Sequence, residues 1–154
     1  MSKKRRLILI VIPLLAALAL AIWFLSPMAR IHRVERTALK QMGKPYVFGT
    51  AGPDSFDCSG LMKYAYAEID VELAHYTQLV AADENYETID DPKALRRGDL
   101  VFFNTVSRDG SIDHVGLWLG RNRFVHASSA EGEVITSDFD DRWQQRFVLA
   151  KRIL

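Results

Sequence analysis

An uncharged apolar run of 19 residues, from Leu7 to Leu25, constrains this chain more than any other feature of its 154 residues. A helix rises about 1.5 Å per residue, so this run could cross the hydrocarbon core of a bilayer, which is about 30 Å thick. A helix in the core of a soluble protein seldom lacks a polar face over such a length. We therefore expect residues 7–25 to form a transmembrane helix.

The flanks of this run indicate that it stays attached to the chain. A cleaved signal peptide usually has an apolar region of about 7–15 residues and a cleavage site of small residues. The segment that follows here, Ser26-Pro27-Met28-Ala29-Arg30, matches such a site poorly. We expect residues 1–29 to be a cytoplasmic basic tail and an uncleaved transmembrane signal anchor, and residues 30–154 to be one domain of ordinary size.

Charge also separates these two parts. The tail holds four basic residues at positions 3–6 and no acid, whereas residues 30–154 hold 16 basic and 19 acidic side chains, a net charge of −3. The sequence has no basic patch, so we expect no nucleic-acid partner. Cys58 is the only cysteine, which excludes an internal disulfide. Basic residues on both sides of the apolar run leave its orientation open on charge alone.

Residues 30–154 divide into a helical first half and a strand-rich second half. Apolar residues recur at helical spacing in the ranges 30–42, 58–69 and 75–82, and residues 83–98 are mostly loop. Short β-branched and aromatic runs predict strands at 100–106, 114–119, 123–127, 133–136 and 147–153. Hairpin turns are expected at 109–110 and 120–122. This order predicts an α+β domain with an antiparallel sheet.

Cys58 is a candidate nucleophile. It follows a loop with glycine and proline and stands at the predicted start of a helix, where the helix dipole stabilises a thiolate. The alternative is a small buried apolar residue, a common state of a lone cysteine. The polar neighbours Asp57 and Ser59 favour the nucleophile, because inert buried cysteines lie among apolar residues.

A thiol nucleophile needs a base within hydrogen-bond reach and a group that orients the base. Of the four histidines, His114 and His126 stand on otherwise apolar predicted strands that a hairpin would place side by side. Each alone could be a satisfied core residue, but together with Cys58 they predict a catalytic triad. His32 fits a solvated position beside the membrane segment, and His75 fits either a cleft or the surface.

The same three residues could instead bind a metal ion as a set of one cysteine and two histidines. Zinc sites usually contain at least one closely spaced pair of ligands. The nearest pair here, His114 and His126, is 12 residues apart. We therefore expect neither a metal site nor a cofactor.

Four segments that contain these residues resemble the motifs of the NlpC family of bacterial cell-wall cysteine peptidases. The resemblance covers residues 31 to about 152 and keeps the order and spacing of Phe56-Asp57-Cys58-Ser59-Gly60-Leu61, Arg97-Gly98-Asp99-Leu100-Val101-Phe102-Phe103, Asp113-His114-Val115-Gly116-Leu117-Trp118-Leu119-Gly120 and Phe124-Val125-His126-Ala127. Three places depart from the usual pattern, and one of them is Ser55, which stands where a glycine often precedes the phenylalanine. Gly49-Thr50-Ala51-Gly52 stands where a Gly-Gly pair is common, and Leu73-Ala74-His75-Tyr76-Thr77 replaces a frequent Leu-Pro-Arg-Thr-Ser run.

The resemblance implies a papain-like fold, in which the nucleophile begins a helix that packs on a C-terminal antiparallel sheet. It implies that Cys58 is the nucleophile and that His114 is the general base and acid. It also implies that His126 is the third member of the triad, which orients His114.

The remaining expected site residues surround the nucleophile. The resemblance implies that the hydroxyl of Tyr46 helps the Cys58 backbone N–H to hold the oxyanion. It implies that Asp57 and Ser59 hold the peptide of the substrate. We place His75 with these two as a substrate-binding residue, because its polar stretch could line the cleft.

The usual activity in this family is endopeptidase cleavage of peptidoglycan stem peptides, between D-glutamate and the following diamino acid. The resemblance therefore implies a peptidoglycan hydrolase whose partners are stem peptides and, through residues 7–25, a membrane. Because the domain must face the wall that it cuts, we expect a single-pass protein of the bacterial inner membrane with a periplasmic catalytic domain. Its activity should respond to pH between about 5 and 8, where histidines titrate.

Two other functions remain open. Relatives of this fold include acyl- and amide-transferring enzymes that use the same Cys/His pair. An apolar groove beside Cys58, in place of a polar cleft beside Asp57, would favour such an enzyme. A catalytically silent wall-binding protein is the other alternative, and it is disfavoured because all three expected catalytic side chains are present.

Overall fold

The computed structural model describes residues 3–24, 26–107 and 109–154. Contacts divide the chain into two compact units, Met1–Arg30 and Ile31–Leu154. The first unit holds helix α1 (Lys3–Phe24), which contains Pro13. Leu25, the last residue of the predicted membrane segment, lies outside the described residues.

Within the described residues, no single helix is both long enough and apolar enough to cross a bilayer. Two consecutive helical segments, Val11–Ile22 and Pro27–Leu39, reach the required length and composition only when they are taken together across a break. The transmembrane helix expected at residues 7–25 therefore stays a prediction.

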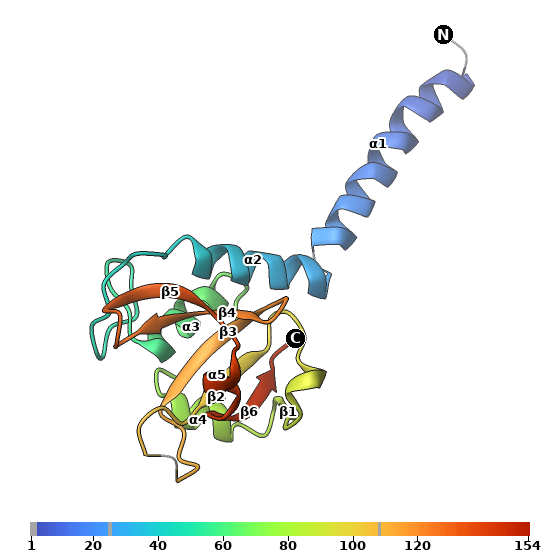
Figure 1. Ribbon diagram of the computed structural model, residues 1–154. Coiled ribbons are helices and arrows are strands. Elements are labelled where there is room, and N and C mark those ends of the chain that lie inside the picture. Colours follow the sequence, from blue (N-terminus) through green and yellow to red (C-terminus); the bar gives the residue numbers. More distant parts are fainter. Residues whose placement is uncertain (1–2, 25, 108) are drawn as a thin grey trace. The chain divides into compact units, whose positions relative to one another are not determined.

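The second unit is built around one six-stranded antiparallel sheet (Figure 1). In the spatial order β1-β6-β2-β3-β4-β5, the strands are β1 (Glu87–Ile89), β6 (Phe147–Arg152), β2 (Leu100–Phe103), β3 (His114–Gly120), β4 (Arg123–Ser128) and β5 (Glu133–Asp138). The other helical elements are α2 (Pro27–Leu39), α3 (Cys58–Ala67), α4 (Thr77–Ala82), the short 3-10 helix η1 (Pro92–Ala94) and α5 (Asp141–Gln144). The predicted α+β class is confirmed.

Helix α3 packs on one face of the sheet, and its side chains build the larger core. Leu61 and Met62 of α3 are buried in one cluster with Val115 of β3 and Val125 of β4. Burial of an apolar side chain of this size contributes about 1.5–3 kcal/mol. Because α3 contacts the sheet mainly through β3, the position of its first residue, Cys58, is set against that strand.

The opposite face of the sheet carries a second, aromatic core that includes Val101 and Phe103 of β2. All four residues of β2 are buried, because its alternate side chains enter one core or the other. The sequence predicts a longer strand, 100–106. The strand ends at Phe103 because the carboxylate of Asp113 accepts the N–H groups of Thr105 and Val106, at 2.8 and 2.9 Å, and turns the chain away.

Three short elements, β1, η1 and α5, were not expected from the sequence. Each has four residues or fewer, which is too short for a periodic pattern of apolar residues to show. Strand β1 forms because Glu87 and Ile89 pair with Arg152 and Ala150 of β6, far along the chain. The first helix of the domain also differs from its expected range, 30–42, because residues 40–42 form turns.

Strands β3 and β4 join through the hairpin predicted at residues 120–122. Gly120, Arg121 and Asn122 all have positive φ, of 78°, 51° and 60°, the left-handed conformation that suits a tight turn between twisted strands. The turn places β4 directly beside β3. It therefore brings His114 and His126 together, as the sequence predicted.

The segment Arg97-Gly98-Asp99 is a structural junction outside the site. Nε of Arg97 donates to the buried carboxylate of Glu35 at 2.8 Å. Asp99, also buried, accepts from Nε of Arg152 at 3.0 Å. These ion pairs tie α2 and β6 to one loop, which explains why this motif carries both charges.

Gly60 stands at a position where a larger residue does not fit. An added Cβ would lie 2.1 Å from the carbonyl oxygen of Thr50 and 2.9 Å from Cα of Ala51. Because these are backbone atoms, we expect Gly60→Ala to lower the free energy of unfolding by about 2–4 kcal/mol in urea denaturation. Gly132→Ala is the control: its Cβ would meet nothing within 4 Å, so only its positive φ costs stability, about 1 kcal/mol. Equal losses in both variants would contradict the steric argument.

Candidate active site

Asp57 organises the segment that carries the candidate nucleophile. It is the N-cap of α3, where its Oδ1 accepts the N–H of Gly60 at 2.6 Å and the hydroxyl of Ser59 at 3.1 Å. Its Oδ2 accepts the N–H of Gly49 at 2.8 Å and so ties the preceding loop to the helix. An N-cap side chain stabilises a helix by about 1 kcal/mol. The buried carboxylate therefore fixes the first turn of α3 in place.

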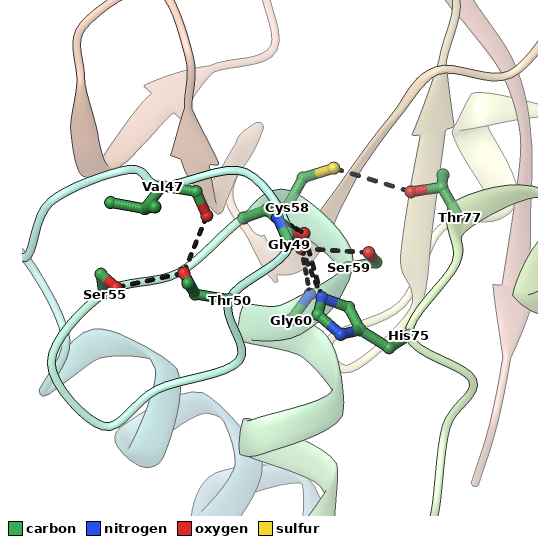
Figure 2. A network of polar contacts seen from close by, with 10 residues as sticks. Val47, Gly49, Thr50, Ser55, Cys58, Ser59, Gly60, His75 and Thr77 are labelled. Carbon is green, nitrogen blue, oxygen red and sulfur yellow. Dashed lines mark hydrogen bonds and ion pairs between the residues drawn. The ribbon is translucent and has the colours of Figure 1, made fainter.

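His75 is the fourth partner of Asp57. Its Nε2 lies 3.0 Å from each carboxylate oxygen of Asp57, and its side chain is partly exposed. Figure 2 shows the His75 ring directed toward the start of α3, below Ser59. The three expected substrate-binding residues, Asp57, Ser59 and His75, are thus brought together, and in the free protein they bind one another. Their role toward a substrate stays a prediction.

Cys58 is the first residue of α3, as predicted. Its sulfur lies 3.6 Å from Oγ1 of Thr77 at the start of α4 (Figure 2), and the backbone N–H groups of Val115 and Ser59 favour its charged form. Burial raises the pKa of the Cys58 thiol. The hydrogen bond with Thr77 opposes this rise, and the negative charge of Asp57 adds to it.

This raised pKa differs from the expectation that the helix N-terminus would stabilise a thiolate. The helix dipole acts within the first turn, but the Asp57 carboxylate already occupies that end, and its charge opposes a second anion. The sulfur is also buried, and burial disfavours the charged form of a thiol. The free protein therefore holds Cys58 as a neutral thiol at pH 7.

Cys58 lies in a cleft of about 420 Å³. Polar and aromatic side chains form its walls, which consist of Tyr46, Phe48, Gly49, Asp57, Cys58, Ser59, His75, Tyr76, Thr77, Gln78 and Asp113. Burial raises the pKa of the Tyr46 hydroxyl, and the negative charge of Asp57, with that of Cys58 once its thiol ionises at high pH, raises it further. Tyr46 therefore keeps its proton at neutral pH and can donate a hydrogen bond, which its expected role at the oxyanion requires.

The two histidines belong to a chain of hydrogen bonds across three strands. Nε2 of His114, the first residue of β3, lies 2.8 Å from Nδ1 of His126 on β4. Nε2 of His126 lies 2.9 Å from the hydroxyl of Ser137 on β5. Burial lowers the pKa of His114 to about 4, although the charge of Asp113 opposes this. Burial, with a further contribution from His114, lowers the pKa of His126 to about 3, so both rings are neutral at pH 7.

Aromatic rings hold this histidine pair in place. Trp143 of α5 stacks on His114, with ring centroids 5.9 Å apart, and meets His126 edge-on at 5.3 Å. Phe103 lies 6.3 Å from His114, and Phe124 lies 4.8 Å from His126. Contacts of this kind restrict the orientation of both imidazole rings.

The structure brings the cysteine and the histidine pair to the same end of β3 but not into one cavity. Asp113 lines the Cys58 cleft and the backbone of Val115 favours the charged form of the thiol, so the residues on both sides of His114 lie near Cys58. The two histidines line a second cavity of about 420 Å³. Nδ1 of His114 makes no hydrogen bond within the described part of the chain, which leaves this nitrogen able to accept a proton.

Three residues of this site were not expected from the sequence: Thr77, Ser137 and Trp143. Ser137 lies one position beyond the predicted end of its strand. A strand drawn to Asp138 would have placed it opposite Phe124 and close to the histidines. Thr77 and Trp143 gave no signal, because their contacts join elements that are distant in the sequence.

The alternative use of Cys58, His114 and His126 was as the three ligands of a metal ion. Of the residues that the structure describes, no three His, Cys, Asp or Glu side chains gather closely enough to hold a metal ion. The Cys58 sulfur instead contacts a threonine hydroxyl, which is not among the usual zinc ligands.

Helices packed on a six-stranded antiparallel sheet, with a cysteine at a helix start beside a histidine strand, define a papain-like α+β domain. The sequence model of the NlpC/P60 family matches residues 43–152. This chain belongs to the NlpC/P60 family, as its motifs indicated.

Curated relatives support this assignment. The murein DD-endopeptidase MepH of Escherichia coli (strain K12) is 35% identical over 137 residues, which cover 82% of this chain and 48% of that protein. The probable endopeptidase YafL of the same strain is 42% identical over 135 residues, which cover 80% of this chain and 49% of that protein. The chain therefore spans about half the length of these relatives.

Solved structures agree with the fold. NlpC2 from Trichomonas vaginalis is 30% identical with a TM-score of 0.73, over 80% of this chain and 46% of that chain. The peptidoglycan hydrolase RipB from Mycobacterium tuberculosis is 27% identical with a TM-score of 0.70, over 82% of this chain and 66% of that chain. The expected papain-like arrangement of helices on an antiparallel sheet is thereby confirmed.

The lowered histidine pKa values predict a pH-dependent stability. Between about pH 4 and pH 6.5 the unfolded chain binds more protons than the folded chain, so stability is complete above this range and falls as the pH falls. We expect the free energy of unfolding in urea to drop by roughly 1–2 kcal/mol per histidine from pH 7.5 to pH 5. His126→Asn should remove part of this drop, whereas Gly132→Ala, which removes no titratable group, should leave it unchanged. A drop that is the same in both variants would contradict the assignment.

Proposed function

We propose that this chain is a cysteine endopeptidase that hydrolyses the stem peptides of bacterial peptidoglycan. One observation carries the proposal: Cys58, at the start of α3, shares a cleft with Asp113, which directly precedes the hydrogen-bonded His114 at the start of β3. Membership of the NlpC/P60 family supports a peptidase. The relative named murein DD-endopeptidase supports peptidoglycan as the substrate.

The chain of hydrogen bonds sets the direction in which a proton moves. If Nε2–H of His126 donates to Ser137, its Nδ1 must accept, and Nε2–H of His114 then donates to it. This tautomer leaves the lone pair on Nδ1 of His114 free, as a general base requires. His114 then takes the proton of the Cys58 thiol as the sulfur attacks, so no buried thiolate need exist beforehand.

Attack forms a bond from the sulfur to the carbonyl carbon and moves an electron pair to the carbonyl oxygen. The Cys58 N–H and the Tyr46 hydroxyl hold this oxyanion, and a donor of this kind is worth about 3–4 kcal/mol in the transition state. The protonated His114 gives its proton to the leaving nitrogen as the C–N bond breaks, which releases an amine and leaves a thioester. His114 then deprotonates a water, which hydrolyses the thioester and returns the thiol.

Two bonds of the stem peptide are candidates. The bond between D-glutamate and the following diamino acid is our first proposal, because it is the usual target in the family that the motifs resemble. The names of MepH and MepS of Escherichia coli, both murein DD-endopeptidases, favour a DD bond as the alternative. Acyl transfer is the second candidate function, because Tyr46, Phe48 and Tyr76 give the cleft beside Cys58 a largely apolar lining.

Digestion of purified peptidoglycan by the full chain in detergent, followed by mass spectrometry, tests the peptidase. We expect fragments that end in D-glutamate and fragments that begin with the diamino acid, and a DD cut would instead separate cross-linked stem peptides. Cys58→Ala should abolish all of them, and His32→Asn should yield the same fragments as the unaltered chain. An intact fold that produces no fragments would rule out the proposed function.

We also propose that residues 7–25 anchor the chain in the bacterial inner membrane, with the catalytic domain on the periplasmic side. The first unit supports this, because Ile12, Leu14, Leu15, Leu18 and Leu20 are all more than half exposed on α1, and a lipid phase would cover such a surface.

Cell fractionation and protease treatment test the anchor. We expect the full chain in the membrane fraction, from which detergent but not high salt releases it. We expect added protease to digest the catalytic domain only after the outer membrane has been made permeable. The double substitution Leu15→Arg and Leu18→Arg should weaken membrane retention, because each central charge costs about 2.5–3.5 kcal/mol in a bilayer. Release of the unaltered chain by salt alone would contradict the anchor.

A further inference from the structure

The cavity beside the histidine pair carries charged groups that the mechanism above does not use. Besides His114 and His126, its walls include Arg142, Arg146 and Glu131. None of these three charged side chains takes part in an ion pair within the described residues. Unpaired charges of both signs around one cavity indicate a ligand that itself carries both signs.

We propose that this cavity binds the leaving side of the substrate, a diamino acid that keeps one carboxylate and one ammonium group free. The inference rests on the proposed peptidase function and names the part of the substrate that occupies this cavity. His114 must reach the leaving amine in order to protonate it. His114 lines this cavity and does not line the Cys58 cleft, so the acyl side of the substrate belongs in the cleft and the amine side here.

The two arginines are placed to bind the carboxylate. The guanidinium of Arg142 lies over the ring of Trp143, with its central carbon 5.9 Å from the ring centroid. Nη1 of Arg146 donates to the carbonyl oxygen of Thr105 at 2.7 Å, which steadies the side chain and leaves its other N–H groups available. A guanidinium binds a carboxylate through two parallel hydrogen bonds.

Glu131 supplies the opposite charge for the ammonium group. Its backbone N–H donates to the hydroxyl of Ser128 at 3.1 Å, which holds the turn between β4 and β5 that carries it. Glu131 lines the same cavity as the arginines from a different element. A ligand with only a carboxylate would leave Glu131 unpaired, so the arrangement favours a diamino acid over a simple acid.

Binding of free diaminopimelate, a diamino acid with a carboxylate at each end, tests the subsite without any need for catalysis. The probe is titrated into the full-length Cys58→Ala chain in detergent, and the indole N–H signal of Trp143 is followed by NMR. We expect saturable binding that Arg142→Gln weakens at least tenfold, since a hydrogen bond to a charged group contributes about 1.5–3 kcal/mol. Arg36→Gln, an exposed arginine on α2, is the matched control and should change the affinity less than about twofold.

Pimelate, which has the same carbon chain without amino groups, separates the two charges of the subsite. We expect Glu131→Gln to weaken the binding of diaminopimelate and to leave the weaker binding of pimelate unchanged. Equal losses for both compounds would contradict the role of Glu131. Absence of saturable binding of either compound would overturn the subsite.

Turnover of two synthetic stem peptides distinguishes failure of the subsite from failure of the peptidase. The peptides differ only in the leaving diamino acid, which carries a free carboxylate or a carboxamide. We expect kcat/KM to favour the free acid about tenfold, and Arg142→Gln to remove this preference by slowing only the acid. Cleavage of both peptides at equal rates would contradict the proposed subsite but would support the peptidase function. Diaminopimelate binding without cleavage of either peptide would support the subsite and reject the peptidase.

Discussion

The Asp57 carboxylate is the interaction on which the rest of the site depends. Its two oxygens bind groups from the loop before α3, from the first turn of α3 and from the segment before α4. Cys58 follows Asp57 directly, so its backbone cannot shift without breaking several of these bonds. The same carboxylate disfavours the thiolate. The contacts that fix the position of Cys58 therefore also make its thiol a weaker acid.

A neutral resting state follows from this arrangement and from the burial of the histidines. Cys58 keeps its proton, and His114 and His126 are uncharged at pH 7. A buried thiolate and imidazolium would both lose hydration, which their mutual attraction need not repay. In the proposed mechanism, charge develops only when a substrate carbonyl is present to receive it. The pH response expected from ordinary histidines, between about 5 and 8, accordingly moves toward the lower pKa values of the buried pair.

Local sequence patterns predicted the parts of the site that local structure creates. Cys58 begins a helix because Asp57 caps it, and His114 meets His126 because a left-handed turn closes the hairpin between their strands. Ser137 and Trp143 could not be predicted in this way, since they join the histidines through pairing and packing of separate segments. The prediction that the helix dipole would stabilise a Cys58 thiolate was wrong for the same reason. Burial and the charge of the cap are properties of the folded chain.

The strand order also has a consequence for when this site can exist. Strand β6, the last of the chain, lies between β1 and β2, so β1 has no partner and β2 lacks one neighbour until residues 147–152 arrive. Helix α5, which brings Trp143 to the histidines, comes just before it. Chains generally begin to fold from the N-terminus during synthesis. If the proposed function holds, a chain built in this order stays inert while it is being made, and a prematurely terminated chain would carry Cys58 without the assembled histidine pair.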